Sequence, residues 1–208
     1  VLNNKVNYYF TYKKEGFIPL VIKDLIMRRI RIKEIIKEEK KQSIVNPVLK
    51  ARDYALKILA NSTYGYYAFF GARYYSLECA ASITSFARDF LQKTIESAIK
   101  ANFKVIYADT DSIALVLDSK TEQEALEFLK ETNRTLPSLM ELELENFYTN
   151  GIFVMKKGEV KGAKKKYALL DKSGNIKVVG FETIRRDWSY IAKDVQIKVL
   201  EMILKEDA

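Results

Sequence analysis

Two aspartates, Asp109 and Asp111, are the residues of this sequence best suited to chemistry, and Thr110 separates them. They stand between two β-rich runs within residues 103–118, a pattern that predicts a hairpin with the carboxylates at its tip. Residues two apart on a strand project from one face, which would place the carboxylates side by side. In a chain without histidine, paired carboxylates suit Mg²⁺ or Mn²⁺ and phosphoryl transfer through two metal ions. The alternative is an ordinary turn capped by its own side chains.

A second set of residues could bind an anionic ligand. Lys57, Asn61 and Tyr64 recur at i, i+4 and i+7 and therefore form one stripe on a predicted helix. Arg29 and Lys33 are four residues apart on the preceding helix. If the two helices pack antiparallel, these side chains make a cradle for a triphosphate under a base. Taken singly, each cation is better explained as a solvated helix residue.

Three later clusters are also candidates for binding. Lysines that lead into a strand could reach successive phosphates, and the arginines before the last helix could do the same. A run of alternating glutamates either contributes to a metal site or forms a solvated strand edge. These residues are Lys164, Lys165, Lys166 and Tyr167, then Arg185 and Arg186, and the glutamates Glu141, Glu143 and Glu145.

The elements that must position these residues can be read from periodicity and capping. Helical spacing predicts a long basic helix over residues 17–41, and Asn46 with Pro47 opens a second helix that runs toward Ala60. Further helices are expected over 75–101, from the capping box Thr121 and Glu124 to about 135, and after Asp187 as a cap. Strands are expected at 141–145, 151–156, 165–171 and 176–181. The order predicts an α+β fold with antiparallel strands.

Composition limits the possible classes of protein. The chain has 208 residues, is 48% hydrophobic and holds 8 Gly and 3 Pro, which excludes disorder and low-complexity repeats. No apolar run approaches the roughly 20 residues of a membrane span, and the single cysteine excludes a disulfide framework, so a reducing cytosol is expected. The net charge of +8 comes from an excess of basic residues in the first 60 residues and after residue 150. These two basic regions could bind a polyanion, or their charges could simply lie on solvated helix faces.

Four motifs in a fixed order resemble the polymerase half of a family B DNA polymerase, in particular the archaeal kind. The resemblance spans nearly the whole chain from Gly16-Phe17-Ile18-Pro19 onward, and four ordered motifs are far more specific than one D-x-D. The motifs are Lys57-Ile58-Leu59-Ala60-Asn61-Ser62-Thr63-Tyr64-Gly65, Tyr107-Ala108-Asp109-Thr110-Asp111-Ser112, Lys164-Lys165-Lys166-Tyr167 and Arg185-Arg186-Asp187-Trp188-Ser189.

The resemblance implies a domain plan and a role for each motif. Residues 1–15 would lead into the palm, 16–63 would be the helical fingers hairpin, 64–183 the palm and 184–208 the start of a helical thumb. Arg29, Lys33 and Lys57 would bind the phosphates of the incoming dNTP, and Asn61 and Tyr64 would line the nascent base pair. Asp109 and Asp111 would be catalytic carboxylates with Asp111 the surer metal ligand, and Glu143 and Glu145 are a weaker match to metal-site acids. The lysine motif would grip duplex DNA and the arginine motif would begin the thumb.

The same resemblance implies its partners and cofactor. These would be primer–template DNA, dNTPs and Mg²⁺, with Mn²⁺ as a substitute, in the cytoplasm at the nucleoid and without a membrane. The family's first carboxylate motif, an Asp followed by Ser-Leu-Tyr-Pro, and any exonuclease motif are not in this sequence. An N-terminal polymerase portion would supply both, so the chain is expected to be a split subunit or an excised fragment that is inactive alone. Residues 156–163 resemble an insertion.

Two other functions stay open at this point. A non-catalytic nucleic-acid-binding module derived from such a polymerase would keep the basic surface, although the intact Asp109, Asp111, Lys57 and Asn61 argue against it. A palm enzyme of the reverse-transcriptase kind also has a Tyr before an acidic pair. In that kind the two carboxylates are adjacent, whereas Thr110 separates them here.

Overall fold

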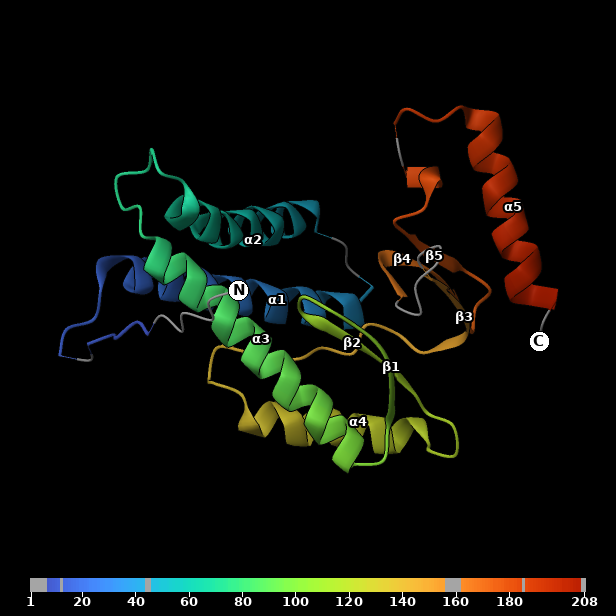
Figure 1. The fold of residues 1–208 in the computed structure, drawn as a ribbon, viewed down its shortest axis with the longest axis horizontal. Helices are drawn as coiled ribbons and strands as arrows, with labels where there is room; N and C mark the ends of the chain where they lie inside the picture. The colour runs from blue at the N-terminus through green and yellow to red at the C-terminus, as the bar shows by residue number, and fades with distance from the viewer. Residues whose placement is uncertain (1–6, 12, 44–45, 156–161, 185, 207–208) are drawn as a thin grey trace, which may run out of the picture. The chain divides into compact units, whose positions relative to one another are not determined.

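The fold mixes helices with two small antiparallel sheets, as the α+β prediction requires (Figure 1). The computed structural model describes residues 7–11, 13–43, 46–155, 162–184 and 186–206. The described residues up to Glu96, with Leu136–Met140, form one compact unit, and Ser97–Thr135 with the described residues from Glu141 onward form the second. No helix in the described part of the chain is both long and apolar enough to cross a membrane.

The first unit contains a hairpin of two long helices, α1 (Phe17–Lys41) and α2 (Pro47–Ala68), which lie side by side (Figure 1). The predicted cap is confirmed, because the Asn46 side-chain oxygen accepts the N–H groups of Val48 and Leu49 at 3.1 and 3.2 Å. Helix α2 continues through Gly65 to Ala68, beyond the predicted end near Ala60, since one glycine weakens a helix without ending it. Neither helix has a fully buried residue.

Helix α3 (Leu77–Lys100) crosses from the first unit into the second and is followed by the predicted hairpin of β1 (Lys104–Asp109) and β2 (Ser112–Val116). Helix α4 (Glu122–Thr135) follows, and its capping box is confirmed. The Glu124 carboxylate accepts the backbone N–H of Thr121 at 2.7 Å, and the Thr121 hydroxyl accepts the N–H of Glu124 at 3.2 Å. These caps start α4 where the sequence predicts it.

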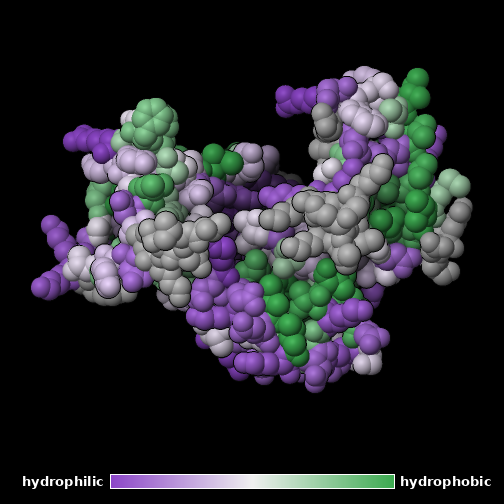
Figure 2. All heavy atoms as spheres, in the orientation of Figure 1, coloured by the Kyte–Doolittle hydropathy of each residue, from purple (hydrophilic) through white to green (hydrophobic). Residues whose placement is uncertain are grey.

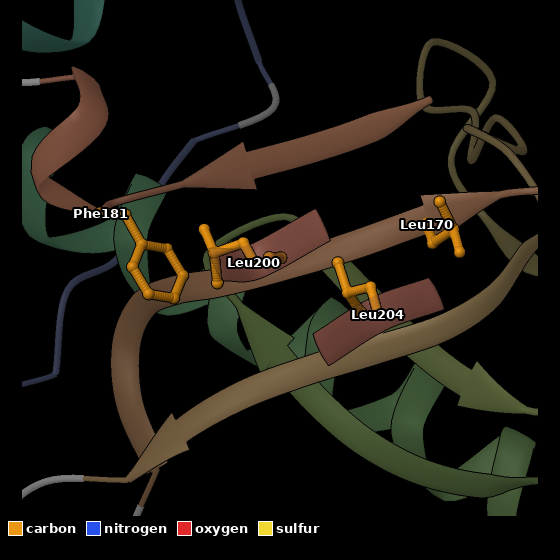
Figure 3. Packing of buried hydrophobic residues seen from close by; sticks show 5 residues of the cluster. Leu170, Phe181, Leu200 and Leu204 are labelled. Carbon is orange, nitrogen blue, oxygen red and sulfur yellow. The ribbon is translucent and has the colours of Figure 1, made fainter. Parts of the chain in front are cut away.

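A three-stranded antiparallel sheet in the order β3-β4-β5 carries the core of the second unit. Its strands are β3 (Tyr148–Met155), β4 (Gly162–Asp171) and β5 (Ile176–Val179), and a short 3₁₀ helix, η1 (Glu182–Ile184), follows. Helix α5 (Tyr190–Glu206) packs on the sheet through Leu200 and Leu204, which meet Leu170 and Phe181 (Figure 3). This cluster fixes the position of β4, the strand that carries the lysine motif.

Two sequence predictions about elements are wrong. Helix α5 begins at Tyr190, and its cap is Ser189, whose hydroxyl accepts the N–H of Ala192 at 3.3 Å, in place of Asp187. Residues 141–145 do not form a strand. The Asn133 side chain binds the backbone of Leu142 on both sides, accepting its N–H at 2.8 Å and donating to its C=O at 2.9 Å. These bonds replace the ladder that a strand would need.

Helix α5 is apolar on its outer side as well as toward the core. Ile191, Val195, Val199 and Met202 are between 46% and 78% exposed, and Figure 2 shows hydrophobic side chains along this helix. Burial of Leu200 and Leu204 on the opposite side therefore leaves a second apolar face on the surface.

Candidate functional site

The two aspartates lie at a tight turn between β1 and β2. Asp109 ends β1 opposite Ser112, and Thr110 and Asp111 form the connection. Thr110 has a left-handed φ of 52°, and the N–H of Asp111 donates to the carbonyl of Asp109 at 2.6 Å. The predicted position at the hairpin tip is confirmed. The predicted arrangement on one strand face is wrong, because β1 ends at Asp109 and Asp111 lies in the turn that follows.

Tyr107 anchors this hairpin to strand β4. Its hydroxyl accepts the backbone N–H of Lys165 at 2.9 Å, and its ring centroid lies 5.3 Å from that of Phe153 and 5.2 Å from that of Tyr167. Ring contacts of this kind add stabilisation beyond apolar burial. Tyr167 of the lysine motif therefore has a structural role in packing the hairpin onto the sheet.

Lys165 lies beside the first aspartate. Its ammonium nitrogen is 3.6 Å from the Asp109 carboxylate. The Lys165 side chain is 66% exposed, whereas that of Asp109 is only 21% exposed. A cation at this distance offsets part of the charge of the carboxylate and stays accessible to an anion on its open side. The side chain of Lys164 lies outside the described residues.

Lys166 is held in an ion pair on β4. Its ammonium group donates to the Glu182 carboxylate at 2.7 Å, and the Gln196 amide on α5 donates to the other oxygen of that carboxylate at 2.9 Å. These two bonds, with the Lys166 bond the stronger influence, lower the pKa of Glu182 from 4.5 to about 2. Lys166 therefore ties β4 to η1 and α5, a contact that was not predicted from the sequence.

We expect the Lys166–Glu182 pair to make the stability of the chain depend on acid pH. Because the pKa of Glu182 is lowered in the folded state, its stabilising effect is complete above pH 4.5 and is lost as the pH falls toward 2. Glu182→Gln should lower the melting temperature at pH 7, and its difference from the wild type should vanish near pH 2. Glu201→Gln, at a half-buried position of α5, is the control. A difference that is constant from pH 7 to 2 would contradict this role for Glu182.

The glutamates expected near a metal site are not gathered there. Glu145 accepts hydrogen bonds from the Lys177 ammonium and, at 3.4 Å, from the Tyr148 hydroxyl, both on the three-stranded sheet. Among the described residues, no three Asp, Glu, His or Cys side chains form a group that could hold a metal ion. The structure thus does not join Glu143 or Glu145 to the pair Asp109 and Asp111.

In the helical hairpin of the first unit, Arg29 is paired across the two helices. Its guanidinium Nε lies 3.0 Å from the Asp53 carboxylate on α2, and both side chains are about a quarter to a third exposed. Lys33 follows Arg29 by one turn of α1, and Lys57 follows Asp53 by one turn of α2. In antiparallel helices these steps run in opposite directions, so Lys33 and Lys57 lie about 12 Å apart along the axis. The cations are thus spread along the hairpin, and Arg29 lies between the two lysines.

The remaining predicted binding residues are accessible. Lys57 and Asn61 are exposed on α2, and Tyr64 is 43% exposed. Arg186 is exposed before α5, and Arg185 lies outside the described residues. Sequence reasoning missed Asp53, Tyr107 and Glu182 as the partners that position these groups. Tyr107 could have been found, because it precedes Asp109 by two residues in an alternating strand.

Comparison with known proteins identifies the family to which the chain is similar. The family model for DNA polymerase family B matches residues 1–208. A DNA polymerase of Thermococcus sp. (strain 9oN-7) is 44% identical over 210 residues, which cover 97% of this chain and 25% of the relative. A DNA polymerase of Pyrococcus glycovorans is 45% identical over 208 residues, with the same coverage of 97% and 25%.

A solved structure agrees with the sequence relatives. The family B DNA polymerase from the hyperthermophilic archaeon Pyrobaculum calidifontis has a TM-score of 0.67 and 34% identity, and the match covers 94% of this chain and 23% of that one. The chain thus spans about a quarter of the length of the relatives it matches. Four motifs in order, a family model over all residues and archaeal relatives lead to one conclusion: the chain belongs to DNA polymerase family B.

Proposed function

We propose that the chain contributes the fingers and the C-terminal part of the palm to DNA-templated DNA synthesis, the transfer of a dNTP to a primer 3′-OH. The observation that carries the proposal is the Asp109–Asp111 turn, anchored through Tyr107 to the lysine strand β4. The proposal is supported by the 3.6 Å distance between the Lys165 ammonium and the Asp109 carboxylate, and by the membership of the chain in DNA polymerase family B.

Asp109 and Asp111 are the residues that would hold divalent ions. Their donor set consists of carboxylate oxygens at one turn, which fits Mg²⁺ or Mn²⁺ and does not fit a metal that prefers nitrogen or sulfur. A pair of such ions, when bound, aligns and neutralises the reacting phosphate. Asp109, Asp111 and the neighbouring Lys165 supply the charges of the chain itself at this place.

The cations of the helical hairpin would bind the triphosphate of the dNTP. The Lys57 side chain is exposed and could contact the triphosphate directly. Lys33 and Arg29 would make further phosphate contacts along the hairpin. Asp53 would orient the Arg29 guanidinium, because it fixes one of its N–H groups at 3.0 Å. Asn61 and Tyr64, one and two turns further along α2, would line the base pair.

The DNA duplex would be held by the lysine and arginine motifs. Lys165 and Arg186 have exposed side chains for phosphate contacts, whereas Lys166 is committed to Glu182 and would act by fixing β4. Lys164 and Arg185 would extend this surface. We infer that Tyr167 supports the motif through its contact with Tyr107.

We further propose that synthesis needs a polypeptide that carries the family's first carboxylate motif. The purified chain should give no primer extension with Mg²⁺ and dNTPs, because one turn with two carboxylates cannot enclose a metal pair. Adding a polypeptide with that motif should restore extension, as read on a sequencing gel.

Two results would count against this proposal. Robust extension by the purified chain would overturn the need for a partner. Duplex binding with no extension for any added partner would favour the non-catalytic binding module. A partner whose own Asp is replaced by Ala serves as the matched control, since it keeps the association and removes the ligand.

Lys57→Ala in the assembled enzyme should raise the KM for the dNTP and lower kcat together. A phosphate contact that strengthens in the transition state affects both, at a cost of roughly 2–4 kcal/mol in kcat/KM. Single-turnover incorporation measures it. Arg52→Ala is the control, because Arg52 is an exposed cation five residues earlier on another side of α2. An effect on DNA affinity alone would place Lys57 on the duplex.

A further inference from the structure

A pocket of about 420 Å³ in the first unit is not used by the proposed chemistry. It lies between the start of α1 and the turn that follows α2, and we call it the aromatic pocket. Its lining residues include Phe17, Tyr67, Arg73, Tyr74 and Tyr75. The volume is in the range of small-ligand sites, and aromatic walls with a few polar groups are typical of such sites.

The walls of the aromatic pocket are held in place by local contacts. The rings of Phe17 and Tyr74 lie 6.1 Å apart, centroid to centroid. The turn after α2 folds back onto that helix through the N–H of Ser76, which donates to the carbonyl of Tyr67 at 3.1 Å. The ring surfaces are nevertheless accessible, since Phe17 is 65% and Tyr74 is 46% exposed. A flat ring could therefore stack here without rearrangement of the backbone.

The charge of the aromatic pocket is positive. The Arg73 guanidinium lies 5.7 Å from the centroid of the Tyr74 ring, and no described carboxylate pairs with it. Helix α1 begins at the same place with no acidic residue in its first turn and no side-chain cap from Gly16. The third residue of α1 is Pro19, which has no N–H, and the N–H of Leu20 donates to Gly16, so the N–H groups of Phe17 and Ile18 and the helix dipole add to the field of Arg73. Aromatic faces beside one cation match a base with one phosphate.

We propose that the aromatic pocket binds one unpaired nucleotide of a DNA strand. The base stacks on the rings of Tyr74 and Phe17, and the phosphate is bound by Arg73 and the first N–H groups of α1. A strand fits better than a free dNTP, because one arginine and one helix end match a single phosphate and the exposed rings leave the pocket open for the chain to continue. The identity of the strand as DNA rests on the proposed function.

Binding to the full chain without Mg²⁺ tests this directly. The probe is a fluorescein-labelled 12-nucleotide oligo(dT), measured by anisotropy against an abasic oligomer of the same length and charge. The wild type should bind oligo(dT) about 10-fold more tightly than the abasic oligomer. Tyr74→Ala should remove most of this preference, Tyr74→Phe should keep it, and Arg73→Ala should weaken binding of both oligomers several-fold.

Matched controls lie on the same hairpin. Tyr54→Ala and Arg52→Ala remove an exposed ring and an exposed cation from α2, at positions 13 and 15 residues before Tyr67, or about 20 Å along the helix. Both should bind like the wild type. Equal affinity of the wild type for the two oligomers, or an unchanged preference in Tyr74→Ala, would overturn the proposal. So would displacement of oligo(dT) by micromolar dTTP from the wild type but not from Tyr74→Ala, which would assign the pocket to a free nucleotide.

The test is independent of catalysis. Asp111→Ala, which should end synthesis under the proposed function, should leave the preference for oligo(dT) over the abasic oligomer unchanged. A chain that binds oligo(dT) as expected and yet needs no Asp111 for synthesis would retain this pocket and lose the proposed function. A chain that needs Asp111 for synthesis and shows no preference for oligo(dT) over the abasic oligomer would keep the proposed function and lose the proposed nucleotide site.

Discussion

Asp111→Ala should abolish nucleotide incorporation by the assembled enzyme, with a loss of at least about a thousandfold, or about 4 kcal/mol in the barrier. Asp111 is one of the two carboxylates proposed to hold the metal ions at this turn, and among the described residues no third acidic side chain joins them, so none can take its place. Primer–template binding should survive, because neither Tyr107 nor Lys165 needs the Asp111 side chain for its contact.

The measurement is single-turnover extension with Mg²⁺, alongside duplex binding by anisotropy. Asp89→Ala is the matched control, since Asp89 is an exposed carboxylate on α3 whose partner is Lys93 at 2.7 Å. Asp111→Asn, which keeps the shape and removes the charge, should be as inactive as Asp111→Ala. If either variant extends the primer at a rate within a few-fold of the wild type, the Asp109–Asp111 turn is not part of the catalytic site.

Gly180→Ala should destabilise the second unit by roughly 3–5 kcal/mol, a large effect for one methyl group. Gly180 has a φ of +67°, and a Cβ there would overlap the carbonyl oxygen of Lys165 and lie 2.7 Å from its carbon. Both atoms belong to the backbone, so strand β4 would have to move. Because β4 carries Lys165 and anchors Tyr107, the movement should also disturb the Asp109–Asp111 turn.

Urea unfolding measures this, and Gly174→Ala separates the two causes. Gly174 has a similar φ of +82° but nothing within 4 Å of an added Cβ, so its substitution carries only the backbone strain of about 1–2 kcal/mol. The difference between the two variants is then the steric term. If Gly174→Ala and Gly180→Ala lower the free energy of unfolding equally, the backbone at Lys165 moves aside at no cost, which would contradict the steric explanation.

Much of the fold could be predicted because its signals are local. The Asn46 cap, the Thr121–Glu124 box and the hairpin around Asp109 each depend on residues within a few positions of one another. The strand expected at 141–145 failed because a distant side chain, Asn133, satisfies the backbone of Leu142. Alternation shows which residues could share a face, but it does not show what else competes for their hydrogen bonds.

The residues of the candidate site come from sequence motifs and stay a prediction, whereas the structure adds contacts that the sequence does not show. Sequence motifs identify Asp109, Lys57 and the lysine motif, whose types and spacing are visible along the chain. They do not reveal that Lys166 is paired with Glu182, 16 residues later, or that Arg29 is paired with Asp53, 24 residues later. Such pairs depend on how separate elements pack, and the same lysine can equally serve a phosphate or a carboxylate.

The pairing of β1 with β2 also limits how this hairpin can change in length. The ladder shifts between Val105 and Tyr107, so that Ile106 is an extra residue without a partner. Val105 is opposite Leu115 and Tyr107 is opposite Ala114, which are neighbours on β2, so deleting Ile106 would restore a regular ladder and leave Tyr107 with its present partner. The loss of one residue at Ile106 can therefore be absorbed by the ladder, whereas the loss of one residue between Tyr107 and Asp109 would shift the register of the strand that leads into the turn.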